Sequence, residues 1–112
     1  MSNVLRRSLH LAAKTCLVTW YRLAGPPRIL HFSHGSNAAI LRAFGAQIGR
    51  RSVRVHGPVT LHRAEHGYAN LHIADGCIIN GNVFLDLAAR ITLEEGVSLG
   101  PGVVIMTHNR YN

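Results

Sequence analysis

Residues 73–109 read IADGCIINGNVFLDLAARITLEEGVSLGPGVVIMTHN, a segment in which aliphatic residues recur every six positions. The recurring positions are Ile73, Ile79, Leu85 and Ile91, and then, after a slip of two residues, Leu93, Leu99 and Ile105. A small or β-branched residue follows four positions later, at Cys77, Val83, Ala89, Val97 and Val103. A period of six fits neither an amphipathic helix nor a hairpin strand, but it is typical of short strands joined at tight corners. We therefore expect an all-β solenoid, with the aliphatic side chains inside and Gly or Asn at the corners.

The same repeat is weaker upstream of this segment. The four-residue spacing between an aliphatic residue and a small or β-branched one is found at Ile48 with Ser52 and at Val55 with Val59. Leu61 is the last aliphatic residue of this upstream part. The stretch 62–70 interrupts the repeat and is expected to be a loop that leaves the stack at one corner. The pattern thus predicts short parallel strands over residues 48–61 and 71–107.

The N-terminal part of the chain has the spacing of helices instead. Within residues 3–24, six residues recur at steps of three and four and predict one helical stripe: Leu5, Leu9, Ala12, Cys16, Trp20 and Leu23. The Gly25-Pro26-Pro27 sequence should end this helix, which we expect to pack on its own domain or on a neighbouring subunit. Its apolar residues also suit the interface of a bilayer. A second helix is predicted from Ala38 to Phe44, capped by Ser36 or Asn37 and followed by Gly45.

Composition and charge limit the classes of protein that this chain can be. A length of 112 residues with 47% hydrophobic residues allows one folded domain and argues against disorder. We divide it into a basic helical segment, residues 1–44, and a repeat domain, residues 45–112. Residues 1–64 carry ten Lys or Arg and no acid, whereas residues 65–112 carry two Arg and five acidic residues. Such a basic half suits nucleic acid, an anionic membrane surface or an acidic partner.

The sequence also indicates a compartment. Two cysteines are too few for a disulfide scaffold and favour the cytoplasm. No apolar run is long enough to span a bilayer, and Lys14 interrupts the apolar core that a secretory signal would need. An Arg-rich, acid-free start is also found in organelle transit peptides, and that alternative stays open.

The repeat segment resembles the hexapeptide-repeat acyltransferases, and most closely the sugar and polysaccharide O-acetyltransferases that include the maltose and galactoside acetyltransferases. The resemblance covers residues 45–112 and rests on the repeat frame together with the terminal Thr107-His108 pair. It implies a left-handed parallel β-helix, acetyl-CoA as the acyl donor, a saccharide acceptor and a homotrimer. It implies no metal.

The resemblance also implies roles for individual residues. The histidine that ends such a segment is the catalytic base of the family, and His108 is the matching residue; imidazole titrates near neutral pH, as a base for a sugar hydroxyl must. Asn82, in the INGN sequence, matches an asparagine that contacts the acceptor, although a corner residue in left-handed conformation is an equal alternative. Asp86 would hold either the His108 imidazole or an acceptor hydroxyl. Asn80 is expected to be structural.

One departure from the family concerns the end of the chain. Relatives continue past the histidine with further coils that complete the acetyl-CoA groove, whereas this sequence stops at Asn112. We therefore expect the donor site to be incomplete, and we assign no residues to it. The uncapped last coil would leave open strand edges.

Two further classes of function compete with the acetyltransferase. A metal enzyme on the same scaffold would need ligands from His62, His66 and His72, whose spacing does not match successive coils. A non-catalytic interaction module would fit the missing coils and the basic N-terminal segment. Nucleic-acid binding is not expected, because no recognition motif or aromatic platform accompanies the charge.

Overall fold

The chain begins with the long helix that the sequence predicts. The computed structural model describes residues 3–108, so the last residues of the predicted repeat domain, 109–112, lie outside the described part. Helix α1 spans Asn3–Ala24. It ends at Gly25, whose φ of 97° is easily adopted only by glycine and whose N–H donates to the Tyr21 carbonyl at 2.7 Å.

The face on which α1 packs differs from the predicted stripe. The half-buried side chains of this helix are Lys14, Leu17, Val18 and Tyr21, and they face the second helix. All six residues of the predicted stripe are exposed. The helix does pack on its own domain, as expected, but it packs through side chains outside the predicted stripe.

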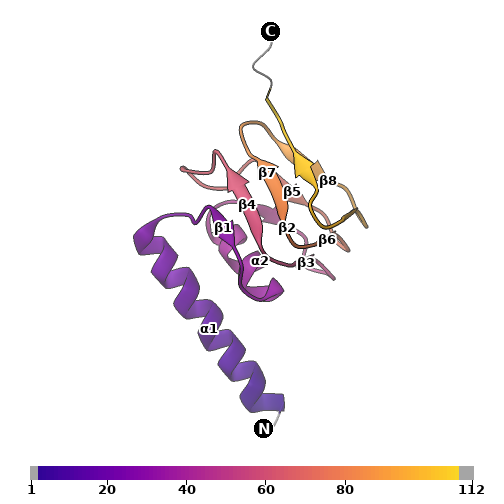
Figure 1. Cartoon of the computed structure of the whole chain (residues 1–112). Helices are drawn as coiled ribbons and strands as arrows, with labels where there is room; N and C mark the ends of the chain where they lie inside the picture. Colours follow the sequence, from indigo (N-terminus) through magenta and orange to yellow (C-terminus); the bar gives the residue numbers. More distant parts are fainter. Residues whose placement is uncertain (1–2, 109–112) are drawn as a thin grey trace.

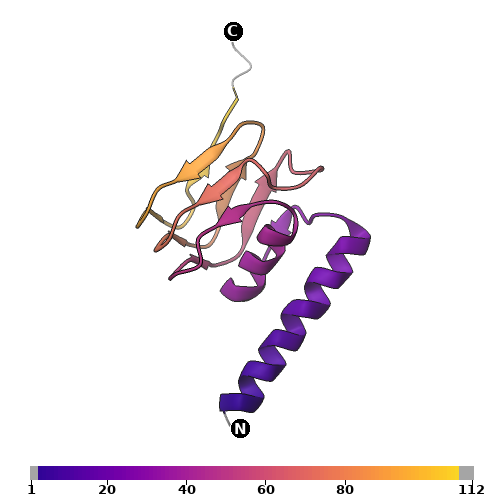
Figure 2. The same cartoon turned by 180° about the vertical axis from the view of Figure 1, so that it is seen from behind.

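Helix α2 spans His34–Ala43 and begins four residues earlier than predicted. Its N-cap is Ser33, whose hydroxyl accepts a hydrogen bond from the Ser36 N–H at 3.3 Å. The predicted cap residues, Ser36 and Asn37, are therefore inside the helix and buried. Gly45 follows the helix with a φ of 102°, as the sequence predicts. Figures 1 and 2 show α2 between α1 and the strands, with the N-terminal end of α1 farthest from them.

Ten short strands make up the rest of the regular secondary structure in residues 3–108. They are β1 (Ile29–Leu30), β2 (Gln47–Ile48), β3 (Arg54–Val55), β4 (Val59–His62), β5 (Leu71–Ile73), β6 (Ile78–Ile79), β7 (Val83–Asp86), β8 (Ile91–Leu93), β9 (Ser98–Leu99) and β10 (Val104–Ile105). The first of them was not predicted. It places a strand within the segment that the sequence analysis assigned to helices.

The strands form three sheets, in the orders β2-β5-β8, β3-β6-β9 and β1-β4-β7-β10. Every pair is parallel except β1 with β4, which is antiparallel. Each strand from β2 to β7 therefore pairs in parallel with the strand three places later in the chain. Val59 is opposite Val83, and Leu85 is opposite Ile105. The prediction of several short parallel strands after an N-terminal helix is confirmed.

Most of the predicted inward positions are buried. The exposed fraction is 3% at Ile73, 0% at Ile79 and Leu85, and 6% at Leu93. Leu99 and Ile105 pack against this core but are only partly buried, because β9 and β10 lie at sheet edges. Ala89, one of the small residues of the repeat, is exposed, whereas Leu87, which the repeat does not include, is buried. The two-residue slip in the repeat falls within β8, between Ile91 and Leu93.

The interruption at residues 62–70 is not a loop that leaves the body of the protein. Tyr68 is fully buried, its hydroxyl donates to the Pro27 carbonyl at 2.6 Å, and its N–H donates to the Phe44 carbonyl at 2.9 Å. His62 itself belongs to β4. The stretch therefore joins the helical segment to the sheets. Within residues 3–108, no helix has the length and apolar character needed to cross a membrane.

Candidate functional site

Two histidine side chains and one aspartate side chain come together at one end of the sheet that contains β4, β7 and β10. His62 ends β4, Asp86 ends β7, and the two residues are directly opposite in the parallel register. Strand β10 pairs with the other side of β7, and His108 follows it by three residues. Because parallel strands end at the same edge of a sheet, the chain gathers these side chains from three separate segments.

Asp86 is fully buried, yet its carboxylate has several donors. Oδ1 accepts from the Ala88 N–H at 3.1 Å, and Oδ2 accepts from the Thr107 N–H at 3.0 Å. Oδ2 also lies 2.5 Å from Nδ1 of His108. These contacts satisfy both carboxylate oxygens, as a buried charge requires.

The hydrogen bonds determine the charge state of Asp86. Burial on its own would raise the pKa of this carboxyl group, but the hydrogen bonds from Thr107, His108 and Ala88 favour the charged form and outweigh it. The pKa of Asp86 therefore lies well below its usual range. The group is a carboxylate at neutral pH, facing the imidazole.

This carboxylate also selects the tautomer of His108. Since Nδ1 faces an acceptor that has no proton to give, Nδ1 must carry the hydrogen, and in the neutral ring Nε2 is left with its lone pair. The His108 side chain retains 28% of its exposure, while Asp86 has none. Asp86 therefore orients His108 as a base. The carboxylate lies in the interior, and the imidazole ring lies at the surface.

Two neighbours of this pair, Thr107 and His62, were not predicted to support a catalytic histidine. The Thr107 hydroxyl donates to the Asp86 carbonyl at 2.9 Å and accepts from the Ala89 N–H at 3.0 Å, so it fastens the segment that carries His108. His62 was considered only as a metal ligand. Its ring stacks near that of His108, with centroids 6.4 Å apart, and lies 5.6 Å from that of Phe84.

A cavity of about 380 Å³ adjoins His62 on the side of the helix-strand connection. The charged residues that line it are Arg28, Arg63 and Glu65. Gly25 and Pro26, which directly follow α1, also line it. A larger hollow of about 710 Å³ lies over β2, β5 and β8, and neither Asp86 nor His108 lines it. Of these two cavities, the smaller one reaches the site through His62, and neither is lined by Asp86 or His108.

Asn82, the other predicted contact for the acceptor, lies elsewhere. It directly precedes β7, whereas Asp86 ends it, so the two residues are at opposite ends of one strand. Its φ is 58°, the left-handed corner conformation, and its N–H donates to the Pro58 carbonyl at 2.8 Å. Asn80 donates from Nδ2 to the Leu99 carbonyl at 2.8 Å, the structural role expected of it.

The histidines considered as metal ligands are separated by the fold. His62 is in β4 and His72 is in β5, which belong to different sheets. In the described part of the chain, no three His, Cys, Asp or Glu side chains are grouped closely enough to hold a metal ion.

Comparison with known proteins adds nothing to this geometry: no protein-family model, no curated protein and no solved structure matches the chain. The assignment of function therefore depends on the side chains described above.

Proposed function

We propose that this protein is an acyltransferase that moves an acetyl group from acetyl-CoA to a hydroxyl group of a saccharide, with His108 as the general base. The observation that carries the proposal is the contact between Nδ1 of His108 and the buried carboxylate of Asp86. A buried, charged partner beside a partly exposed imidazole is the arrangement that activates a hydroxyl nucleophile.

The reaction requires one proton to move twice. Nε2 of His108 takes the proton of the acceptor hydroxyl as its oxygen attacks the thioester carbonyl carbon. The carbon–sulfur bond then breaks, the acetyl group remains on the acceptor oxygen, and the leaving thiolate takes the proton from the imidazolium. Asp86 stabilises the imidazolium between these steps, as its low pKa allows.

The fold that we propose for this activity is a left-handed parallel β-helix of hexapeptide repeats, residues 45–112. Its support is the pairing of each strand with the strand three places later, together with the burial of the six-residue aliphatic positions. The open edges at β8, β9 and β10 favour association, for which we propose a homotrimer. Sedimentation at micromolar concentration tests this, and a stable monomer would contradict it.

The cytoplasm is the compartment that we propose. Both cysteines are free, Cys16 at the surface and Cys77 in the core, which suits a reducing environment.

Release of free thiol from acetyl-CoA, measured with and without a panel of sugar acceptors, tests the activity. His108→Ala should lower acetyl transfer roughly a hundredfold or more, because general-base catalysis contributes about 10²–10⁴-fold. His66→Ala, which removes an exposed histidine from the loop after β4, is the matched control and should keep full activity. Equal rates for the two variants would contradict the assignment.

A non-catalytic interaction module is the second candidate, favoured by the exposed apolar side chains of Val104 and Met106 beside the edge strand β10. Acceptor-dependent release of thiol that depends on His108 would rule it out.

A further inference from the structure

The outward face of α1 has no role in the fold or in the proposed reaction. At about 100° per residue, five side chains of this helix fall within an arc of about 80°. They are Leu9, Ala12, Cys16, Trp20 and Leu23. The centre of this outward face lies about 150° around the helix from the packed face of Lys14, Leu17, Val18 and Tyr21.

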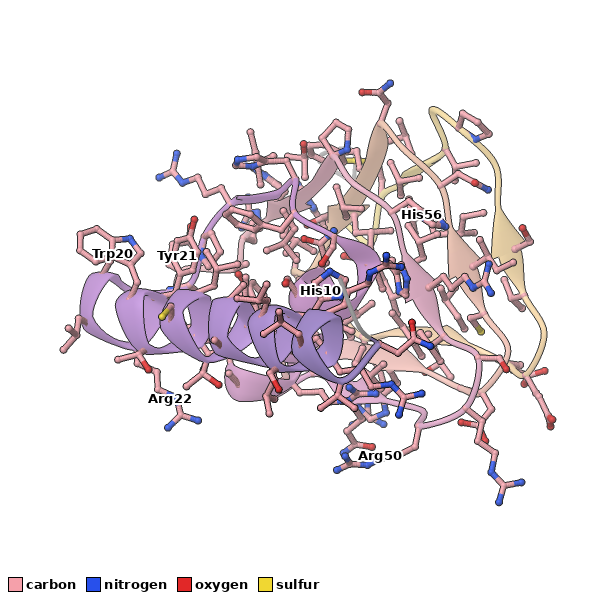
Figure 3. The ribbon with its side chains drawn as sticks, turned by 90° about the horizontal axis from the view of Figure 1, so that it is seen from below. His10, Trp20, Tyr21, Arg22, Arg50 and His56 are labelled. Carbon is pink, nitrogen blue, oxygen red and sulfur yellow. The ribbon has the colours of Figure 1, made fainter. Side chains whose placement is uncertain are left out.

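The large side chains of the outward face are in solvent. The exposed fraction is 52% at Leu9, 63% at Trp20 and 84% at Leu23. Figure 3 shows the Trp20 ring projecting freely near the end of the helix, with Arg22 on the other side. Exposed apolar side chains in a continuous row mark a surface that another body covers.

The charge around this face indicates what that body is. Helix α1 carries Arg6, Arg7, Lys14 and Arg22 and no acidic residue, and the first acidic residue of the chain is Glu65. A second copy of α1 would bring no carboxylate to pair Arg6 and Arg22, the cations that lie about 80° and 120° around the helix from the centre of this face. The partner must therefore be anionic as well as apolar.

An anionic bilayer meets both requirements better than an acidic protein does. The large apolar side chains, Leu9, Trp20 and Leu23, are spread along the helix with the smaller Ala12 and Cys16 between them. They therefore do not form one compact cluster that would fit into a pocket of a protein partner. The interface of a bilayer can bury a row of apolar side chains of any length. A tryptophan fits between the headgroups and the acyl chains, and long Lys or Arg side chains can extend to the lipid phosphates.

We propose that α1 lies in the plane of an anionic phospholipid surface, with its outward face among the acyl chains and with Arg6 and Arg22 at the headgroups. The proposal is independent of the acetyltransferase assignment, because none of these residues contributes to the His108 site.

Vesicle binding tests the proposal directly with the full chain. Vesicles of phosphatidylglycerol and phosphatidylcholine should bind the protein at least tenfold better than phosphatidylcholine alone, and salt should weaken the binding. Trp20 is the only tryptophan in the chain, so its emission reports the insertion of this helix alone. It should shift to shorter wavelength on binding, and lipids with brominated acyl chains should quench it.

Leu9→Glu and Leu11→Glu form a matched pair of variants. Both replace an exposed leucine of α1 with glutamate, but the two positions are about 160° apart around the helix. Leu9→Glu should weaken vesicle binding at least tenfold, whereas Leu11→Glu should weaken it only about twofold, through its charge.

Three outcomes would overturn the proposal. One is equal loss of binding in the two variants, which would indicate attraction by charge without insertion. Another is an unquenched Trp20 in bound wild-type protein, which needs no variant and so does not depend on their folding. The third is failure to bind anionic vesicles while Leu9→Glu changes the sedimentation of the protein, which would assign the face to a protein contact.

Discussion

Asn82 and Asp86 lie at opposite ends of the same strand, Asn82 at the corner before β7 and Asp86 at its last residue. Because a strand rises about 3.3 Å per residue, roughly 13 Å of backbone separates them. Within one chain, therefore, the Asn82 amide does not face the ring of His108 that Asp86 orients. Any contact of Asn82 with an acceptor at His108 would require a second copy of the chain or an acceptor long enough to span about 13 Å.

Substitutions at Asn82 should separate its two roles. Its φ of 58° is freely adopted by glycine, so Asn82→Gly should keep the free energy of unfolding nearly unchanged. Asn82→Ala should lower it by about 1 kcal/mol, the cost of placing a Cβ in this region. Urea unfolding measures both. Since the glycine variant keeps the corner, a raised KM for the acceptor in that variant supports the substrate contact, and an unchanged KM restricts Asn82 to the fold.

Asp86→Asn should disturb the orientation of His108 without removing the ring. An amide can donate as well as accept, so it no longer requires the hydrogen of His108 to be on Nδ1. Nitrogen NMR should detect the Nδ1–H tautomer in the wild type and a mixture in the variant. Acetyl transfer should fall roughly tenfold or more, since the base then presents Nε2 less often. A variant that keeps both the tautomer and the rate would contradict the role given to Asp86.

Much of the repeat domain could be predicted from the sequence because its period is short and regular. The six-residue spacing placed Ile73, Ile79, Leu85 and Leu93 in the core, where they are buried. The start of α2 was missed because residues 33–37 are polar and small, a composition that suits a turn as well as a capped helix. Strand β1 was missed because two residues carry no periodic signal, and its pairing with β4 is a long-range contact.

The sequence predicted only the members of the site that lie at the ends of the neighbouring parallel strands β7 and β10. Asp86 and His108 are one turn of strands apart, and the pairing of β7 with β10 brings them together. His62 depends on the irregular stretch 62–70, whose length no repeat sets, so its register with Asp86 could not be read from the spacing. The packed face of α1 was ambiguous for another reason, since both of its faces are apolar.

Acid should destabilise the protein through Asp86. Folding lowers the pKa of the Asp86 carboxyl group below its value in the unfolded chain, which is about 3.9. As the pH falls below that value, the unfolded chain takes up a proton at Asp86 more readily than the folded protein does, and unfolding is favoured. The stabilisation is therefore complete above this pH and is lost as the pH falls toward the folded pKa. Chemical unfolding between pH 7 and pH 3 should show this loss in the wild type and a flatter dependence in Asp86→Asn. Glu95→Gln, which removes an exposed carboxylate, should keep the wild-type slope.

The amide of Asn37 should contribute more to stability than that of any corner asparagine. Asn37 is fully buried in α2; its Nδ2 donates to the Val55 carbonyl at 2.8 Å and to the Phe32 carbonyl at 3.1 Å, and its Oδ1 accepts from the Phe32 N–H at 3.0 Å. One side chain thus ties the start of α2 to strand β3. Asn37→Ala leaves these backbone groups buried without their partner, which should lower the free energy of unfolding by about 1–3 kcal/mol.

Asn80→Ala is the matched control for this prediction. It removes one hydrogen bond, from Nδ2 to the Leu99 carbonyl, at a half-buried corner, and should cost no more than about 1 kcal/mol. Urea unfolding at neutral pH compares the two variants, with an unchanged dependence on urea showing that each still unfolds from the same folded state. Because a domain of this size loses roughly 4–8 °C of melting temperature per kcal/mol, the difference should also be visible on heating. Equal losses in the two variants would mean that α2 is held to the sheets by its apolar contacts alone, through residues such as Ile40 and Leu41, which are buried in the same core.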